Sequence, residues 1–263
     1  MIYHNINPAL VDFGIIQIRY YGLFYALGFL IAYFMIPKIA ERKGIKITKD
    51  DAADFIFYAI LGVVLGARLA YILFYNFMSY IQNPIEIFAV WHGGLSFHGG
   101  LIGAVLACWY FCKKKRISFF DFLDIVVVPV ALALALGRVG NFMNGELYGR
   151  AAEVPWCIDY SHNQHMPDIP GGCRHPSQIY SSIKDLAIFG VLLFMSRKKL
   201  PKGTMFWSFV ALYGLFRTIV EFFRQPDSQL GLIFGNLSMG QLLSIPMFLI
   251  GGFMVFRIYF KKQ

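Results

Sequence analysis

Long apolar runs alternate with short clusters of basic residues along this chain, and this alternation restricts the fold more than any other feature. A membrane-spanning helix needs about 20 consecutive, mainly apolar residues. Seven stretches approach this requirement, namely 18–36, 52–74, 95–112, 122–136, 179–195, 205–223 and 240–256. The sequence therefore predicts an all-α polytopic membrane protein with seven transmembrane helices in a single transmembrane domain, 1–263.

The positions of the basic clusters predict the topology. The clusters follow the first, third, fifth and seventh stretches, at 38–49, 113–116, 197–202 and 257–262. Because cytoplasmic loops collect Lys and Arg, we expect a periplasmic N-terminus and a cytoplasmic C-terminus. The loop 75–94 contains no Lys or Arg, in agreement with a periplasmic position. The first apolar stretch follows a neutral segment and precedes a basic cluster, which is the reverse of the order in a secretory signal.

Composition excludes several other classes of protein. Only 15% of the residues are charged and the mean hydropathy is +0.56, whereas a soluble domain carries roughly 25% charged residues. The net charge of +9 comes mostly from short loops beside apolar stretches. We therefore attribute it to topology and anionic lipid, and we expect no nucleic-acid partner.

The polar segment 149–177 contains four prolines and is predicted to form a small periplasmic cap inserted in the transmembrane domain. Cys157 and Cys173 both lie in it. An oxidising periplasm would permit a disulfide, but sequence alone leaves their distance open. Cys108 and Cys112 lie near the inner end of the third stretch, where we expect them to pack as small apolar side chains.

Eight basic residues lie outside the clusters, within the apolar stretches or on the outer side: Arg19, Arg68, Arg138, Arg150, Arg174, Lys184, Arg217 and Arg224. Cations inside a membrane are energetically costly and indicate functional sites. For some of these residues, a structural role is an alternative to a functional one. Arg68 and Lys184 could extend to the interface, Arg217 and Glu221 could form an ion pair at i,i+4, and Arg224 could be a charge at the rim.

Counting about 1.5 Å per helical residue from the basic clusters places one set of polar residues about 22 to 28 Å from the inner side. The set comprises Tyr21, Arg68, His98, Arg217 and Glu221, with Arg138 near the outer end of its stretch. With a hydrocarbon core about 30 Å thick, these residues form one layer below the outer headgroups. Guanidinium groups bind phosphate through paired hydrogen bonds. The layer therefore predicts a site for an anionic phospholipid head in the outer leaflet.

Several dense polar motifs resemble those of the phosphatidylglycerol–prolipoprotein diacylglyceryl transferase family. They are RYYG at 19–22, HGGL at 98–101, GRVGNFMNGELYG at 137–149, RHPSQIY at 174–180, YGLFRTIVEFFRQPD at 213–227 and SMGQLLSIP at 238–246. The resemblance implies a multi-pass enzyme of the bacterial inner membrane. It also implies transfer of a diacylglyceryl group from phosphatidylglycerol to the lipobox cysteine of prolipoprotein signal peptides. A thioether and glycerol phosphate would be formed in this first step of lipoprotein maturation.

In such a reaction the substrate supplies the nucleophile, so the enzyme needs no reactive cysteine. A thiol has a pKa of about 8.5 and attacks as the thiolate. We expect His98 to be the catalytic base, with positioning of substrate as the alternative. Arg138 and Arg217 are expected to stabilise the charge that grows on the phosphate.

The remaining substrate-binding candidates share this layer and these motifs: Tyr21, Arg68, Asn141, Asn144, Glu146, Gly149, Tyr213, Glu221 and Arg224. No cofactor or metal is expected, since the histidines lack the spacing of a zinc site. Two other classes of function remain as alternatives. A transporter would use buried cations along a path, but the polar residues form one layer and no inverted repeat is visible. A lipid-binding scaffold would not require a histidine beside the cations.

Overall fold

The computed structural model describes residues 2–14, 17–89, 91, 93–165, 169, 171–226, 232–233 and 237–260. Two compact units divide the chain. One unit combines residues 1–32 with 124–263, and the other comprises residues 33–123. We call them the discontinuous unit and the central unit, and each is described by itself.

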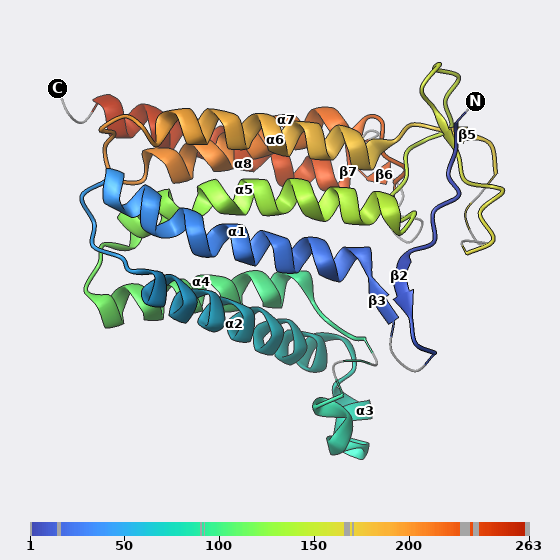
Figure 1. The fold of residues 1–263 in the computed structure, drawn as a ribbon, viewed down its shortest axis with the longest axis horizontal. Helices are drawn as coiled ribbons and strands as arrows, with labels where there is room; N and C mark the ends of the chain where they lie inside the picture. The colour runs from blue at the N-terminus through green and yellow to red at the C-terminus, as the bar shows by residue number, and fades with distance from the viewer. Residues whose placement is uncertain are drawn as a thin grey trace. The chain divides into compact units, whose positions relative to one another are not determined.

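Among the described residues, seven helices of 18 residues or more fall on the seven predicted stretches (Figure 1). They are α1 (Tyr20–Arg42), α2 (Lys49–Tyr75), α4 (Phe97–Lys115), α5 (Phe119–Met143), α6 (Ser177–Met195), α7 (Thr204–Glu221) and α8 (Met239–Phe260). Between α2 and α4 lie a short helix, α3 (Phe77–Gln82), and a 3₁₀ turn, η1 (Pro84–Ile87).

Five of these helices, α1, α2, α5, α6 and α8, are long and apolar enough to cross a membrane. The other two, α4 and α7, are 19 and 18 residues long and are not among these five. The α4 sequence includes His98 and three lysines, and α7 includes Arg217 and Glu221. The chain thus has the helical content predicted for a membrane protein.

Glycines hold α2 and α4 together in the central unit. Gly62 and Gly66 on α2 face Gly99 and Gly103 on α4 so closely that a Cβ added at Gly62 would lie 2.5 Å from the carbonyl oxygen of Gly103. Such small-residue spacing lets two helices approach through their backbones, as is common in membranes. The rings of Phe55, Phe111 and Phe122 pack with centroid distances of 4.8 to 5.4 Å.

In the discontinuous unit, α7 packs against both α6 and α8. Close backbone contacts again depend on glycine, since a Cβ at Gly214 would lie 2.5 Å from the carbonyl oxygen of Ser244. The buried Asp124 carboxylate accepts hydrogen bonds from the backbone N–H groups of Gly203 and Phe206, at 3.0 and 2.8 Å. It thereby caps the N-terminus of α7, where free N–H groups and the helix dipole favour an anion.

Short strands form part of the predicted cap. One sheet has the order β1-β4-β5, where β1 (Ile2–Tyr3) runs parallel to β4 (Ile158–Asp159) and β4 runs antiparallel to β5 (Cys173–Arg174). Cys157 and Cys173 form a disulfide with a Cα–Cα distance of 5.4 Å. Two hairpins complete the strands of the described residues: β2 (Ala9–Asp12) with β3 (Gln17–Arg19), and β6 (Leu232–Ile233) with β7 (Leu237–Ser238).

Candidate functional site

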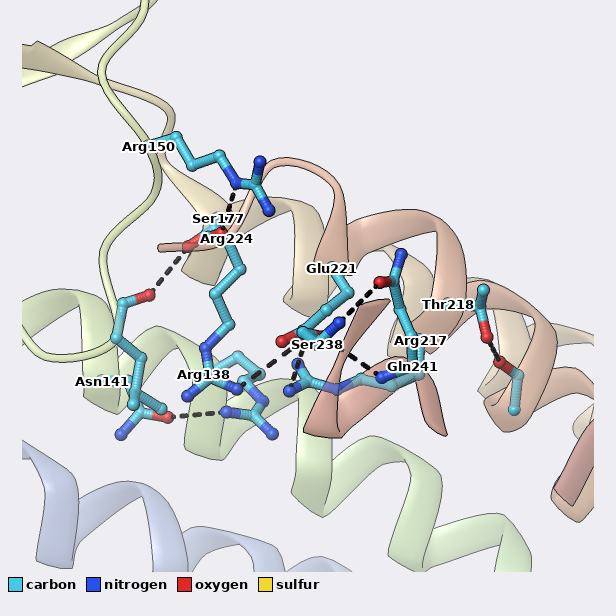
Figure 2. A network of polar contacts seen from close by, with 12 residues as sticks. Arg138, Asn141, Arg150, Ser177, Arg217, Thr218, Glu221, Arg224, Ser238 and Gln241 are labelled. Atoms are coloured by element: carbon cyan, nitrogen blue, oxygen red, sulfur yellow. Dashed lines mark hydrogen bonds and ion pairs between the residues drawn. The ribbon is translucent and has the colours of Figure 1, made fainter. Parts of the chain in front are cut away.

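Three arginines from two helical regions gather within the discontinuous unit. Figure 2 shows the side chains of Arg138, Arg217 and Arg224 extending toward a common region. Arg138 comes from the end of α5, Arg217 from α7, and Arg224 follows α7. Arg217 interacts electrostatically with both other arginines. We call these three residues the arginine cluster. Like charges so close together require counter-charges or an anionic ligand.

Glu221 provides a counter-charge for the arginine cluster. Its buried carboxylate contacts Arg217 at 2.7 Å, as predicted for an i,i+4 pair, and lies 4.0 Å from Arg224. A Cβ added at Gly240, in the first turn of α8, would lie 2.8 to 2.9 Å from this carboxylate. Glycine at 240 therefore makes the space that Glu221 occupies. Because Glu221 is shared, the cluster retains net positive charge.

A capping box fixes the start of α8 beside Glu221. The Ser238 hydroxyl accepts from the Gln241 backbone N–H at 3.2 Å, and the Gln241 side chain accepts from the Ser238 backbone N–H at 3.0 Å. This reciprocal pairing is the motif that Ser followed by Gln three residues later predicts. It defines the position of Gly240 relative to the Glu221 carboxylate.

Helix α5 extends beyond the predicted apolar stretch 122–136 into the glycine-rich motif that follows it. The helix continues to Met143 through Gly137, Arg138 and Gly140. A Cβ at Gly140 would lie 3.0 Å from the Tyr21 ring, so this glycine serves close packing. Of the glycines at 137, 140, 145 and 149, only Gly145, at φ +65°, has the left-handed conformation that a helix end requires.

The turn after α5 brings Glu146 back to the helix. The Glu146 N–H donates to the Asn141 carbonyl oxygen at 2.9 Å, and the Gly145 N–H donates to that of Phe142 at 3.0 Å. These are the two hydrogen bonds of a Schellman motif. As a result, the Asn141 and Asn144 side-chain amides donate to the two Glu146 carboxylate oxygens at 3.2 and 3.1 Å. Asn141 also accepts from Arg138 at 3.4 Å, which links this network to the arginine cluster.

Two predicted tyrosines lie beside these networks. The Tyr21 hydroxyl is 3.0 Å from the Tyr25 hydroxyl, and Tyr21 interacts electrostatically with Arg138 and Glu146. Tyr213, one turn before Arg217 on α7, interacts electrostatically with Arg217. Both phenols can therefore offer neutral hydrogen bonds near the arginines.

Gly149 packs tightly where the cap joins the helices. A Cβ there would lie 2.6 Å from the His175 Cβ and 2.7 Å from the Phe223 carbonyl oxygen. The Gly149 N–H donates to the His175 carbonyl oxygen at 3.0 Å, and Gly149 bridges to Arg224 in a β-type pair. Gly149 thus places the backbone beside Arg224 through close packing, without a left-handed conformation.

Lys184 and Asp185 were not recognised as part of this region from sequence. Both side chains are buried and form an ion pair on α6. The Lys184 ammonium lies 4.1 Å from the centroid of the Tyr213 ring, and Asp185 interacts electrostatically with Arg138 and Arg217. The alternative that Lys184 extends to the interface is therefore wrong. Adjacent opposite charges inside an apolar run were the sequence signal for this pair.

His98 and Arg68, the other two predicted site residues, belong to the central unit. His98 is the second residue of α4, and within its unit it is exposed beside the Phe97 ring, with the ring centroids 5.8 Å apart. Arg68 is buried in α2, so it does not extend to the interface. In the described part of the chain, no group of three His, Cys, Asp or Glu residues could hold a metal ion.

Comparison with known proteins assigns the family. A family model described as prolipoprotein diacylglyceryl transferase matches residues 8–257. The chain belongs to this family. A phosphatidylglycerol–prolipoprotein diacylglyceryl transferase of Geobacter sulfurreducens is 49% identical over 252 residues, which cover 95% of each chain.

Other family members are similar over nearly their whole length. The Aeromonas hydrophila transferase is 41% identical over all of this chain and 94% of its own. The Vibrio vulnificus transferase is 43% identical over 98% of this chain and 93% of its own. Together they confirm the resemblance stated from the motifs.

Proposed function

We propose that this chain transfers the diacylglyceryl group of phosphatidylglycerol to the lipobox cysteine of a prolipoprotein in the bacterial inner membrane. The proposal rests on family membership and on the net positive charge of the arginine cluster. The seven long helices would span the membrane with the N-terminus in the periplasm, which puts the arginine cluster near the outer leaflet. Both substrates reach such a site within the bilayer.

The reaction is a substitution at the glyceryl carbon that carries the phosphate oxygen. The cysteine thiolate forms the carbon–sulfur bond while the carbon–oxygen bond breaks, and the electron pair leaves on the phosphate. A phosphodiester monoanion becomes glycerol phosphate with one more negative charge. Arg138 and Arg217 would hydrogen-bond the phosphate oxygens, and fixed guanidinium donors at this point stabilise the developing charge. Glu221 would orient Arg217, and Asn141 would orient Arg138.

The neutral groups around the cluster would hold the rest of the substrates. Tyr21, Asn144 and Tyr213 offer hydrogen bonds to the glycerol head or to the peptide, and Glu146 holds the asparagines. His98 would accept the thiol proton, because an imidazole is the usual general base of enzymes and only the thiolate attacks well.

Removal of the Arg138 guanidinium tests this function directly. We expect Arg138→Ala to lower the transfer rate at least about 100-fold, the scale of losing one preorganised donor to a developing anion. The assay measures glycerol phosphate release from phosphatidylglycerol in the presence of a lipobox peptide. Arg197→Ala, at an exposed arginine after α6, is the matched control and should retain full activity. Normal turnover by Arg138→Ala would exclude the phosphate role.

The same assay on the native chain tests the alternative functions. Lipid binding or lipid movement without release of glycerol phosphate would favour a scaffold or a transporter.

A pH series tests the role of His98. A general base is needed most where the thiol is protonated, well below its pKa of about 8.5. We therefore expect His98→Gln to lower the transfer rate much more at pH 6 than at pH 9. A loss that is equal at both pH values would assign His98 to substrate positioning.

A further inference from the structure

Among the described residues, Arg68 on α2 donates hydrogen bonds to backbone carbonyls alone, and these use every donor of its side chain. A guanidinium group has five N–H donors. In Arg68 the Nε donates to one carbonyl oxygen at 3.1 Å, Nη1 donates to two at 2.5 and 3.2 Å, and Nη2 donates to two, one of them at 3.1 Å. The accepting carbonyls belong, in chain order, to Glu86, Ile87, Ala89, Gly93 and Gly94. No Arg68 donor is left for a lipid phosphate.

The backbone around Arg68 directs its carbonyl oxygens toward the Arg68 guanidinium group. Gly93 and Gly94 have φ values of +84° and +76°, a conformation that other residues rarely adopt. A Cβ at Gly94 would lie 3.0 Å from Arg68 Nη1 and 2.7 Å from the Tyr71 ring. The Tyr80 ring lies 5.1 Å from the guanidinium carbon, within the range of a cation–π contact. The buried charge of Arg68 is therefore stabilised by main-chain dipoles and an aromatic ring.

The same segment leads directly into the helix that carries His98. Two residues after Gly94, the Ser96 N–H donates to the Ala67 carbonyl oxygen at 3.0 Å. Ala67 is the neighbour of Arg68 on α2. The Ser96 hydroxyl caps α4 by accepting from the Gly99 N–H at 3.4 Å. Gly99 in turn packs against the Gly66 backbone. Contacts to α2 thus lie on both sides of His98, two residues before it and one residue after it.

We propose that Arg68 is a positioning residue for transfer, which fixes the backbone of residues 86–89 and 93–96 and through it the place of His98 at the start of α4. This inference rests on the proposed function of His98 as the thiol base. The His98 ring is exposed and lies beside Phe97 of the same helix, so its position follows that of the backbone that carries both residues. Arg68 acts through carbonyl groups and has no contact with lipid in this role.

The test compares Arg68→Lys with the native enzyme over pH 6 to 9, using phosphatidylglycerol and a lipobox peptide. Lysine keeps the charge, but one ammonium group cannot donate to all the carbonyl oxygens that the planar guanidinium group binds. We expect kcat to fall roughly 10- to 100-fold at pH 6, the effect of moving a catalytic group by about 1 Å. The deficit should shrink toward pH 9, as for His98→Gln, and KM for phosphatidylglycerol should stay unchanged. Arg197→Lys is the matched control.

A double variant separates the inference from the proposed function. With His98 already replaced by Gln, Arg68→Lys should lower the rate less than about twofold, because the two changes remove one shared contribution. A full additional loss, a deficit independent of pH, or a raised KM for phosphatidylglycerol would overturn the positioning role and leave the role of His98 intact. Full activity of His98→Gln alone would instead refute the base, and the inference with it.

Gly94→Ala provides an independent disturbance of the same contacts if Arg68→Lys does not fold. Its added methyl group would press on Arg68 Nη1, while the chemical identity of both Arg68 and His98 is kept. We expect the same pH-dependent loss of kcat, again absent from the His98→Gln background. A loss with any other pH dependence, or none at all, would contradict the inference.

Discussion

At the residue scale, the geometry of the arginine cluster depends on the space that Gly240 leaves for the Glu221 carboxylate. We expect Gly240→Ala to displace this carboxylate and loosen Arg217, lowering the transfer rate about 10-fold or more while α8 still folds. Gly252→Ala is the matched control, because it lies on the same helix with no atom within 4 Å of an added Cβ. Helix propensity favours Ala in both variants. Equal activity in the two variants, measured as glycerol phosphate release, would show that Glu221 tolerates the displacement.

Another residue-scale prediction concerns His4, which joins the N-terminal segment to the end of α5. His4 Nε2 lies 2.8 Å from the Phe142 carbonyl oxygen, which can only accept, and Nδ1 lies 3.0 Å from the Asn163 amide nitrogen. The ring is therefore neutral, with its hydrogen on Nε2. Burial lowers the pKa of His4 below its ordinary value of 6.5. Since the unfolded segment binds the proton more readily, the stabilisation is complete above about pH 6.5 and declines as the pH falls.

Hydrogen exchange of the backbone at residues 2–6 measures this effect. We expect protection, corrected for intrinsic exchange, to be lower at pH 5 than at pH 8. In His4→Gln the pH dependence should disappear, because the amide does not titrate in this range. An unchanged pH dependence in that variant would assign the effect to another group.

At the element scale, the contact between α2 and α4 should be the one most sensitive to added volume in the central unit. We expect Gly103→Ala to destabilise the chain by about 1–3 kcal/mol, the usual effect of overpacking, since its Cβ would meet the Gly62 carbonyl. Gly190→Ala on α6 has open space at its Cβ and should be neutral or slightly stabilising. Thermal unfolding in detergent compares the two variants. Equal midpoints would contradict the close glycine contact.

The helices were predictable from sequence because apolar length is a local property. All seven predicted stretches coincide with long helices, and their ends shift where local capping decides, as at Ser96 and Ser238. Counting along the helices placed Arg138 and Arg217 in one layer, and these two interact in the discontinuous unit, whereas Arg68 of the same predicted layer belongs to the central unit. In contrast, the carbonyl groups that bind Arg68 and the Asp124 cap on α7 depend on contacts between distant segments. Charge and hydropathy patterns do not encode such contacts. Counting along the helix did not predict that the Arg68 donors face backbone carbonyls.

At the scale of the whole molecule, the basic clusters predict the orientation in the membrane. We expect a cysteine introduced by Asn83→Cys, between α3 and η1, to react with a membrane-impermeant thiol reagent added outside the inner membrane. A cysteine introduced by Lys199→Cys, after α6, should react only after the membrane is permeabilised. Both positions are exposed, so accessibility within the protein does not distinguish them. Replacement of Cys108 and Cys112 removes the free thiols of the described chain. The opposite labelling pattern would reverse the proposed topology.

A structure of the full chain with phosphatidylglycerol in lipid tests the central claim most directly, because it locates the phosphate among the helices. We predict that the lipid phosphate lies within hydrogen-bonding distance of the guanidinium groups of both Arg138 and Arg217, with the scissile glyceryl carbon open to a thiol. A phosphate bound away from these two arginines, while they remain engaged only with Asn141 and Glu221, would contradict the account.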